Sequence, residues 1–474
     1  MNTLYKRLFR FLSSPRVAVI LLVYICLFAI VGTLVPQTGL EIDSPISAFL
    51  EVNVVASAVS TLGLHDAFSS PAFLLPVAFL LMSTCACAWK RFMVARKRSQ
   101  MIAEISQSQR TVGGRSLGIS FPSDRINAHD QKLIADTLEE LSFGTPYHSE
   151  QLVCASRSVW ALYASPLFHI LLAITLAVIL AGRLTRSEAL MVAPIDQTRT
   201  ITQENLDITQ RGAFHTFASP PPNILLISKE ENYITDGQPR GSAGELAIIT
   251  EAGRVEKKQL TYVNRPLSFR SLMIHVADDG FALKFSVLDE TNERESSHYE
   301  FTRISDFEGE VTANNAHELF QPVRISTEDP DTPYAVFQLM PSIVDGEPVA
   351  GKMQDAYGFM WIADEEMRAL GDPELIRVGQ TYSIAEGKAI RFDGLSSALL
   401  LRVVDDWSVP YLYSLAVLTT LALSIALLFC PRFCAIYIDE KTGELKALTR
   451  YYRPHAQNAE EIEAKIQHVF AAQK

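Results

Sequence analysis

Two familiar functional motifs are absent from this sequence, and so is an excess of basic residues. There is no HExxH zinc motif and no CxxCH haem-attachment motif, which excludes a zinc peptidase of that type and a c-type cytochrome. The chain has 42 Lys and Arg against 53 Asp and Glu, a formal net charge of -11. Proteins that bind nucleic acid usually carry a basic patch or stripe, so no nucleic-acid partner is expected.

Cysteine is missing from the whole stretch between Cys154 and Cys430. A segment of that length can rely on an apolar core, and a lack of thiols avoids mispairing in an oxidising compartment. The two sulfurs of CPRFC at 430–434 are too few for a structural zinc site without His partners. We expect reduced packing cysteines, while a membrane thiol relay stays open for the four that flank two apolar runs: Cys85, Cys87, Cys430 and Cys434.

Long apolar runs are plentiful, within a composition that is 48% hydrophobic over 474 residues. A helix crosses the roughly 30 Å hydrocarbon layer with about 20 apolar residues, because each residue rises about 1.5 Å. Four runs reach this length, at residues 17–35, 72–89, 162–181 and 411–430. A buried core helix is the alternative for each. The first run exceeds the roughly 7–15-residue apolar part of a signal peptide, so a retained anchor is expected.

Basic residues gather beside these runs in a pattern that predicts the orientation in a membrane. They cluster before the first run and directly after the second, whereas residues 36–71 contain no Lys or Arg. Since cytoplasmic flanks are the ones enriched in Lys and Arg, both termini are expected in the cytoplasm and the large segment between the third and fourth runs outside it. The clusters comprise Lys6, Arg7, Arg10, Arg16, Lys90, Arg91, Arg96, Lys97 and Arg98.

The segment 182–410 is strand-like, because apolar and polar residues alternate between clusters of Gly, Pro, Asn and Asp. It predicts a large antiparallel β domain, with hairpin turns at Ala252-Gly253 and Asp279-Gly280, where Gly tolerates a positive φ. Aromatic side chains are expected to fill its interior, namely Phe281, Phe285, Phe337, Phe359 and Trp361.

Shorter elements are expected between the other runs. Ser44-Pro45 predicts a short helix in the outer loop, because Ser can cap a helix and Pro fits its first position. The loop 90–161 predicts a small α+β element with a helix near 129–141. The fold class is membrane α plus all-β: four transmembrane helices, a large extracytoplasmic antiparallel β domain between helices three and four, and a small cytoplasmic α+β loop between helices two and three. The predicted segments are 1–36, 37–71, 72–89, 90–161, 162–181, 182–410, 411–430 and 431–474.

One histidine, His169, lies inside an apolar run, about two turns into the third and on its cytoplasmic half. An ionisable side chain in hydrocarbon is costly and usually faces the interior of a helix bundle, so it marks a candidate functional site. The ring can relay protons, form an interhelical hydrogen bond, or supply an axial nitrogen to haem iron. All three roles stay open on the residues alone, and no other run holds a His as a second ligand.

Four short sequences together resemble the ResB family, also called CcsB, over nearly the whole chain. LMSTC at 81–85 and LFHIL at 167–171 are similar to the family's exit from the second span and entry to the third. The family's GTxxPQ and VNxPL motifs are matched by GTLVPQ and VNRPL, at Gly32, Thr33, Pro36 and Gln37, and at Asn264, Pro266 and Leu267.

The resemblance implies a subunit of System II cytochrome c maturation in the bacterial inner membrane, working with a partner of the CcsA (ResC) family. Together they would export haem b and present it to apocytochrome c for covalent attachment. This chain would be a non-catalytic subunit of that cytochrome c synthase, or haem lyase, with a thioredoxin-like thiol-reducing protein as a further partner. The family's membrane histidine carries over to His169, as the candidate axial ligand of haem.

The chain departs from the family in two places. Its last outer strand reads VVDDWSVP at 403–410 without the family's Pro-Gly, and His275-Val276 replaces the usual Tyr-Gln. An alternative from another class is a membrane scaffold that binds no haem and docks apocytochrome or a thiol-reducing partner through its β domain. The two hypotheses differ in whether His169 matters.

Overall fold

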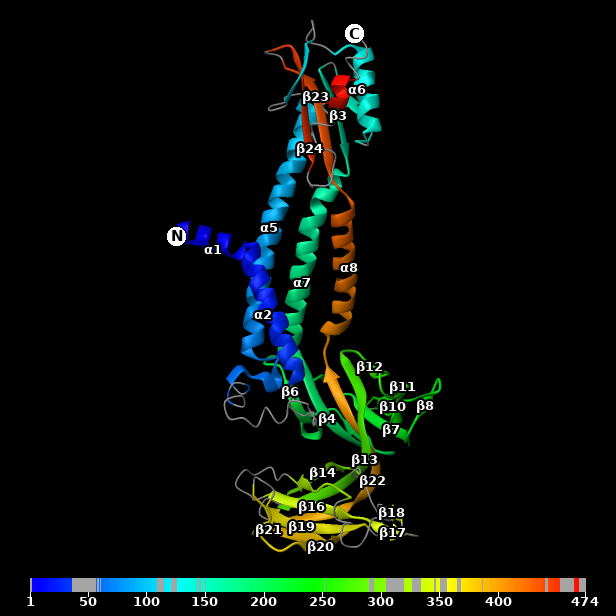
Figure 1. Ribbon diagram of the computed structural model, residues 1–474. Coiled ribbons are helices and arrows are strands. Elements are labelled where there is room, and N and C mark those ends of the chain that lie inside the picture. Colours follow the sequence, from blue (N-terminus) through cyan, green and yellow to red (C-terminus); the bar gives the residue numbers. More distant parts are fainter. Residues whose placement is uncertain are drawn as a thin grey trace. The chain divides into compact units, whose positions relative to one another are not determined.

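A computed structural model describes residues 2–35, 57–108, 115–120, 126–289, 294–303, 319–325, 334–344, 347–349, 356–364, 368–439, 442–451 and 464–468, apart from a few single positions within these ranges. Contacts divide the chain into two compact units (Figure 1). Unit 1 combines Met1–Ala181 with Ser408–Lys474, and unit 2 is Gly182–Trp407.

Unit 1 contains four helices that are long and apolar enough to cross a membrane, which confirms the four predicted spans. The first and second pack together, because Phe28 and Phe73 are buried in one apolar cluster with ring centroids 6.1 Å apart. The helix expected after Ser44-Pro45 lies outside the described residues. The four helices are α2 (Pro15–Leu34), α5 (Pro71–Ser108), α7 (Ala164–Thr185) and α8 (Ser408–Leu428).

A shorter helix, α1 (Asn2–Leu12), precedes α2 and carries its basic residues on one face and its apolar residues on the other. The break between the two helices is set by Pro15: Ser14 before it is extended, and Pro15 occupies the first turn of α2. Ser83 of α5 donates a hydrogen bond from its hydroxyl to the Leu12 carbonyl at 2.6 Å. This bond attaches the end of α1 to the helix bundle.

Helix α5 has 38 residues, about twice the length of the apolar run that predicts it. Its second half is charged yet keeps Ala95, Ile102 and Ile105 buried against a sheet. Helices in proteins are stabilised mostly by packing of such an apolar face, so α5 continues well beyond the length that a bilayer requires. The apolar run at 72–89 does not predict this extension.

A five-stranded antiparallel sheet packs on the end of α5, and its strands come from two distant parts of the chain, in the order β1-β24-β23-β3-β2. Strands of one sheet cannot lie on opposite sides of a bilayer. Therefore α7 and α8, which lie between these parts, must cross the bilayer as a pair. The tail strands were not predicted. The strands are β1 (Arg115–Ser120), β2 (Tyr147–His148), β3 (Leu152–Arg157), β23 (Arg432–Ile438) and β24 (Glu444–Tyr451).

Strand β23 serves two apolar cores, because alternate side chains of a strand point to opposite faces. Every second residue from Cys434 packs with α6 (Ala128–Glu140), the helix predicted near 129–141. The alternate residues from Phe433 pack with α5. The Asn127 side chain caps α6 by accepting a hydrogen bond from the Asp130 amide at 2.8 Å.

Unit 2 consists of antiparallel sheets, as the alternating pattern predicts. A seven-stranded sheet has the order β12-β13-β22-β4-β6, with β14 paired to β13 and β21 to β22. Its strands are β4 (Ser187–Pro194), β6 (Asp207–Arg211), β12 (Leu267–Phe269), β13 (Leu272–Asp289), β14 (Arg294–Thr302), β21 (Thr381–Ala385) and β22 (Lys388–Asp405).

Two four-stranded sheets pack against the seven-stranded one. The first is β5 (Thr198–Thr200), β7 (Asn223–Glu230), β10 (Ala243–Ile249) and β11 (Val255–Thr261). The second is β15 (Val323–Ile325), β16 (Tyr334–Met340), β19 (Tyr357–Ala363) and β20 (Glu374–Arg377). The remaining short elements are β8 (Ile234–Thr235), β9 (Gln238–Pro239), β17 (Ser342–Val344), β18 (Glu347–Val349), and the 3-10 helices η1 (Leu64–Asp66), η2 (Val159–Tyr163) and η3 (Gln203–Asn205).

The two longest strands, β13 and β22, have 18 residues each and pair from Leu272–Asp405 to Asp289–Lys388. At about 3.3 Å per residue each is roughly 60 Å long. One end of the pair belongs to the core with β7 and β10, and the other to the core with β16 and β19 (Figure 1). The same two strands therefore join both cores of unit 2.

One predicted hairpin turn is present and the other is wrong. Gly253 has φ +75 and closes the turn between β10 and β11. Asp279 and Gly280, in contrast, lie within β13, where Gly280 pairs with Ala398 of β22. A Cβ at position 280 would come within 2.3 Å of the Thr302 carbonyl oxygen on β14. Gly280 is therefore explained by the close approach of a neighbouring strand and not by a turn.

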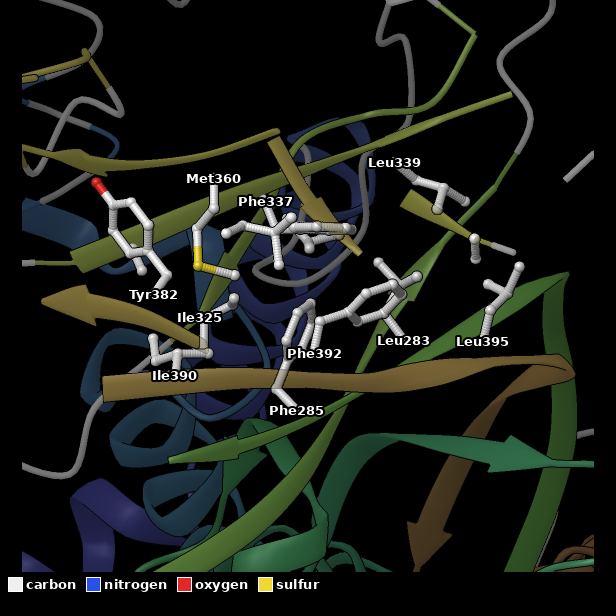
Figure 2. Packing of buried hydrophobic residues seen from close by; sticks show 14 of the residues in the cluster. Leu283, Phe285, Ile325, Phe337, Leu339, Met360, Tyr382, Ile390, Phe392 and Leu395 are labelled. Carbon is white, nitrogen blue, oxygen red and sulfur yellow. The ribbon is translucent and has the colours of Figure 1, made fainter. Parts of the chain in front are cut away.

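Aromatic rings fill the core beside β16 and β19, as predicted for Phe285 and Phe337, which are fully buried (Figure 2). Their ring centroids lie 5.3 Å apart, and both contact Phe392 of β22. Phe359 and Trp361 of β19 are only half-buried, because they point to the opposite face of their strand. Phe359 and Trp361 therefore lie outside the core that holds Phe285 and Phe337, and Phe281 packs at its border.

Replacing Phe337 with Ala is expected to destabilise unit 2 by about 3–5 kcal/mol, because it removes a ring from the centre of a close-packed core. Thermal unfolding of the purified chain measures the effect. Phe214→Ala is the matched control, since Phe214 is 70% exposed, and it should leave the unfolding midpoint unchanged. Equal midpoints for the two variants would contradict the core assignment.

Candidate functional site

A cavity of about 650 Å³ lies within unit 1, between the α1–α2 junction, α5, α7 and α8. Pockets for small molecules and cofactors span about 300–1,000 Å³, so its size suits a ligand. His169, the histidine that the sequence singles out, is part of the wall. The lining residues are Ser13, Pro15, Cys87, Lys90, Arg91, Val94, Ala95, Arg98, Ala161, Leu162, Ser165, Pro166, Phe168, His169, Leu423, Ala426, Leu427 and Pro431.

His169 lies in the second turn of α7 and is half-buried. Its Nδ1 is 2.8 Å from the carbonyl oxygen of Ser165, one turn earlier. A carbonyl oxygen can only accept a hydrogen bond, so Nδ1 carries the proton that is donated there, and the tautomer with this proton has its lone pair on Nε2. The Phe168 ring stands edge-on to the imidazole at 5.1 Å. A backbone carbonyl holding one ring nitrogen is the arrangement by which histidine ligands of metals are oriented.

Helix α5 supplies the polar part of the cavity wall. The Cys87 thiol lines the cavity together with His169 and Arg91. Arg91 also donates a hydrogen bond from Nη1 to the Ser165 hydroxyl at 3.0 Å, which connects α5 to α7. From the sequence Arg91 is only a marker of orientation, whereas the structure places it beside the candidate site.

The wall chemistry fits a haem group. An imidazole Nε2 can ligate iron, and Leu423 and Leu427 of α8 with Val94 of α5 provide apolar surface for a porphyrin. The described lining residues include no second histidine, so this chain would offer one axial imidazole. Haem bound here would bring an iron centre and two carboxylates, and this chain would offer the imidazole, the apolar walls and the cationic side chains.

The four cysteines that flank the second and fourth apolar runs occupy different environments. Cys434 is fully buried in the core with α6 and Cys430 is half-buried at the end of α8, so CPRFC does not present two accessible thiols. Cys85 is exposed, whereas Cys87 lines the cavity. Within the described parts of the chain, no group of three or more His, Cys, Asp or Glu is placed to hold a metal ion. A relay through Cys434 would need its buried thiol to open first.

Residues 114–118 form a G-x-S-x-G sequence, a motif that in some hydrolases marks a nucleophilic serine on a strand-to-helix turn. Ser116 lies within β1 instead, opposite Lys446 of β24. Its hydroxyl donates to Glu444 Oε2 at 2.7 Å. In this chain the serine of the motif therefore forms a cross-strand hydrogen bond within the sheet.

Comparison with known proteins identifies the family. A model of the ResB-like family matches residues 16–360. The chain belongs to the ResB-like family. It is 24% and 23% identical over 282 residues to proteins named cytochrome c biogenesis protein CcsB from Prochlorococcus marinus, strains MIT 9312 and AS9601. Each alignment covers 58% of this chain and 61% of the relative, so the chain spans about three fifths of the length of these relatives.

Two of the motif residues through which the chain resembles the ResB-like family, Gly32 and Thr33, lie in α2. A Cβ on Gly32 of α2 would lie 2.5 Å from the Ala67 Cβ, so glycine permits close contact there. Thr33 bonds back to the Ile30 carbonyl at 2.7 Å. Pro36 and Gln37 lie outside the described residues. Of the described motif positions in the first span, Gly32 therefore permits close packing, and neither Gly32 nor Thr33 lines the cavity.

The VNRPL sequence forms the turn between β11 and β12. Asn264 has φ +66, a left-handed conformation that Asn tolerates better than most residues. The Pro266 carbonyl accepts a hydrogen bond from Gln259 Nε2 at 2.9 Å, and Leu267 is fully buried in the core with β7 and β10. This family motif thus fixes a turn in unit 2.

Charged groups in unit 2 form structural networks. Arg186 pairs with Glu188 at 2.5 Å and with Asp406 at 3.8 Å, which joins the two ends of the unit.

Burial, with Arg402 nearby, lowers the pKa of His275. Burial, with Asp207 nearby, raises the pKa of Glu300 on β14 to about 7.

The accessibility of the cysteines can be tested by alkylation of single-cysteine variants. Cys430 should react with N-ethylmaleimide in the native chain, whereas Cys434 should react only after unfolding, because its side chain is enclosed by β24 and α6. Mass spectrometry of native and denatured samples reports both rates. Equal native rates at the two positions would mean that the sheet does not bury Cys434.

Glu300 predicts a defined pH dependence of stability. Its pKa is about 7 when folded, above the ordinary value of 4.5, so the folded state holds a proton that the unfolded state has lost between these pH values. The contribution of the Glu300 carboxyl group to the free energy of unfolding is therefore fully present below about pH 4.5, and it is lost as the pH rises to about 7. Glu300→Gln should therefore stabilise the chain at pH 8, by on the order of 3 kcal/mol at most.

Chemical denaturation at pH 5 and pH 8 measures this effect. Glu256→Gln, at an exposed position of β11, controls for loss of one carboxylate. A Glu300→Gln variant whose stability difference from wild type is the same at both pH values would refute the assignment.

Proposed function

We propose that this ResB-like chain is a haem-handling subunit of the cytochrome c maturation machinery. The observation that carries the proposal is the cavity with His169 in its wall, which combines one oriented imidazole, apolar surface and cationic side chains. The relatives named cytochrome c biogenesis protein CcsB support the same assignment. The transported ligand is haem b, with His169 Nε2 as its axial ligand.

The partner of this chain is a membrane protein of the CcsA (ResC) family, and the acceptor of haem is apocytochrome c. Support comes from the large apolar side chains exposed along α2 and α8, which offer lipid-depth surface to another membrane protein. This chain has the role of a non-catalytic subunit: it binds and orients haem, and the covalent attachment takes place with the partner. A thioredoxin-like protein keeps the apocytochrome thiols reduced.

The chain lies in the bacterial inner membrane with both termini in the cytoplasm. Lys and Arg beside the first two spans favour this orientation. It puts the β1–β24 sheet on the cytoplasmic side and unit 2 on the outer side. The cavity is lined by Lys90 and Arg91, which directly follow the apolar half of α5, so haem enters it from the cytoplasmic side.

Replacing His169 should remove haem. His169→Gly is expected to lower the haem content of the purified chain, alone or with its partner, by at least about tenfold, because the iron loses its protein ligand. Absorption spectra measure haem content, and added imidazole should restore binding in this variant by occupying the space of the lost ring. His129→Ala, at an exposed position of α6, is the control.

Cytochrome c yield in cells that carry His169→Gly gives the second readout. Unchanged haem content together with unchanged cytochrome c yield would overturn the proposal. That result would favour the scaffold, in which unit 2 docks apocytochrome or a thiol-reducing partner and the bundle binds no haem.

A further inference from the structure

Helix α1 is short and leaves large apolar side chains exposed. Leu8 is 54% exposed and Phe11 is 57% exposed. An isolated helix of fewer than about 12–15 residues is marginal in water, and helices in proteins depend on the burial of an apolar face. The 11 residues of α1 therefore need a surface that covers these exposed apolar side chains.

The charge of α1 has one sign and lies on one side. The helix contains no Asp or Glu, and the first acidic residue of the chain is Glu41. Lys6 and Arg10 are exposed and lie about one turn apart on one face, because about 3.6 residues complete a turn. Leu8 is two residues from each of them and therefore points to the opposite side. A cationic face opposite an apolar face is typical of helices that lie in the surface of a membrane.

The attachment of α1 to α5 sets its depth in the bilayer. The Ser83 hydroxyl donates a hydrogen bond to the Leu12 carbonyl at 2.6 Å, and Lys90 is the first charged residue of α5. Seven residues of helix separate Ser83 from Lys90, which is about 10 Å along the axis. Surface helices bury their apolar face to a similar depth, about 5–10 Å below the headgroups. The extended backbone of Ser14 turns α1 away from α2 at this level (Figure 1).

We propose that α1 lies in the plane of the membrane surface and binds anionic phospholipid, with its basic side chains at the phosphate groups and its exposed apolar side chains in the acyl layer. Continuity with the first span supports lipid as the partner, since only Ser13 and Ser14 separate α1 from α2. Each Lys or Arg near an anionic bilayer surface strengthens binding by about fivefold. The inference does not depend on haem or on His169.

Hydrogen exchange of the α1 amides tests the proposal on the full chain. The chain is placed in nanodiscs of phosphatidylcholine, with or without phosphatidylglycerol, and exchange of residues 6–12 is followed by mass spectrometry. Exchange should be at least about tenfold slower in the anionic discs, because several basic side chains act together. The amides that pair β3 with β23 are the reference, since the sheet is held by its own apolar cores in either lipid.

Two double variants separate binding by α1 from a general effect of charge. Lys6→Gln with Arg10→Gln should remove most of the difference between the two lipids. Arg96→Gln with Lys97→Gln should keep it, because these exposed residues of α5 lie about two turns beyond Lys90. Each pair removes one Lys and one Arg. Unchanged exchange in the β3–β23 sheet shows that both variants are folded.

Three results would overturn the inference. The first is equal exchange of α1 in the two kinds of disc, which wild type alone can show. The second is slow exchange that is the same in both lipids and disappears when each disc holds a single chain, since a second copy would then cover the apolar face. The third is loss of the lipid difference in the Arg96 and Lys97 variant, which would show an effect of net charge instead of binding by α1.

Discussion

The pairing of β3 with β23 is the constraint on which the candidate site depends. β3 ends at Arg157, shortly before η2 and α7, and β23 begins at Arg432, shortly after α8. Their backbone hydrogen bonds place Arg157 opposite Arg432, so the start of α7 and the end of α8 are held side by side (Figure 1). His169 in the second turn of α7 thereby faces the same cavity as Leu427 in the last turn of α8. A shift of this register would move one wall of the cavity along the other.

Apolar length and strand alternation were sufficient to predict the architecture, because both are local properties of the sequence. The four spans and the β character of unit 2 follow from them. Two features depend on long-range packing instead and were missed. The tail strands β23 and β24 acquire their place only by pairing with β3 and β1, and the second half of α5 is helical because the sheet buries one of its faces.

The candidate site was predictable in part. His169 stands out because an imidazole within an apolar run needs a physical reason. Lys90, Arg91 and Arg98 gave no such signal, since basic residues after a span are expected for orientation alone. Only the three-dimensional arrangement separates those that line the cavity from Arg96 and Lys97, which do not. A helical wheel of residues 87–98 separates the side chains on the cavity-facing side of α5 from the others. That pattern distinguishes Arg91 and Arg98, which line the cavity, from Arg96.

The shared strands of unit 2 have a consequence for biosynthesis. Leu272 at the start of β13 pairs with Asp405 at the end of β22, more than one hundred residues later. Both cores contain residues of β22, so neither core is complete until nearly all of the unit has been synthesised. Non-local pairing of this kind slows folding, because a long loop must close before the contacts form. During that interval the edge of β13 that later pairs with β22 is unpaired, and an exposed strand edge of this kind favours aggregation until the last strand arrives.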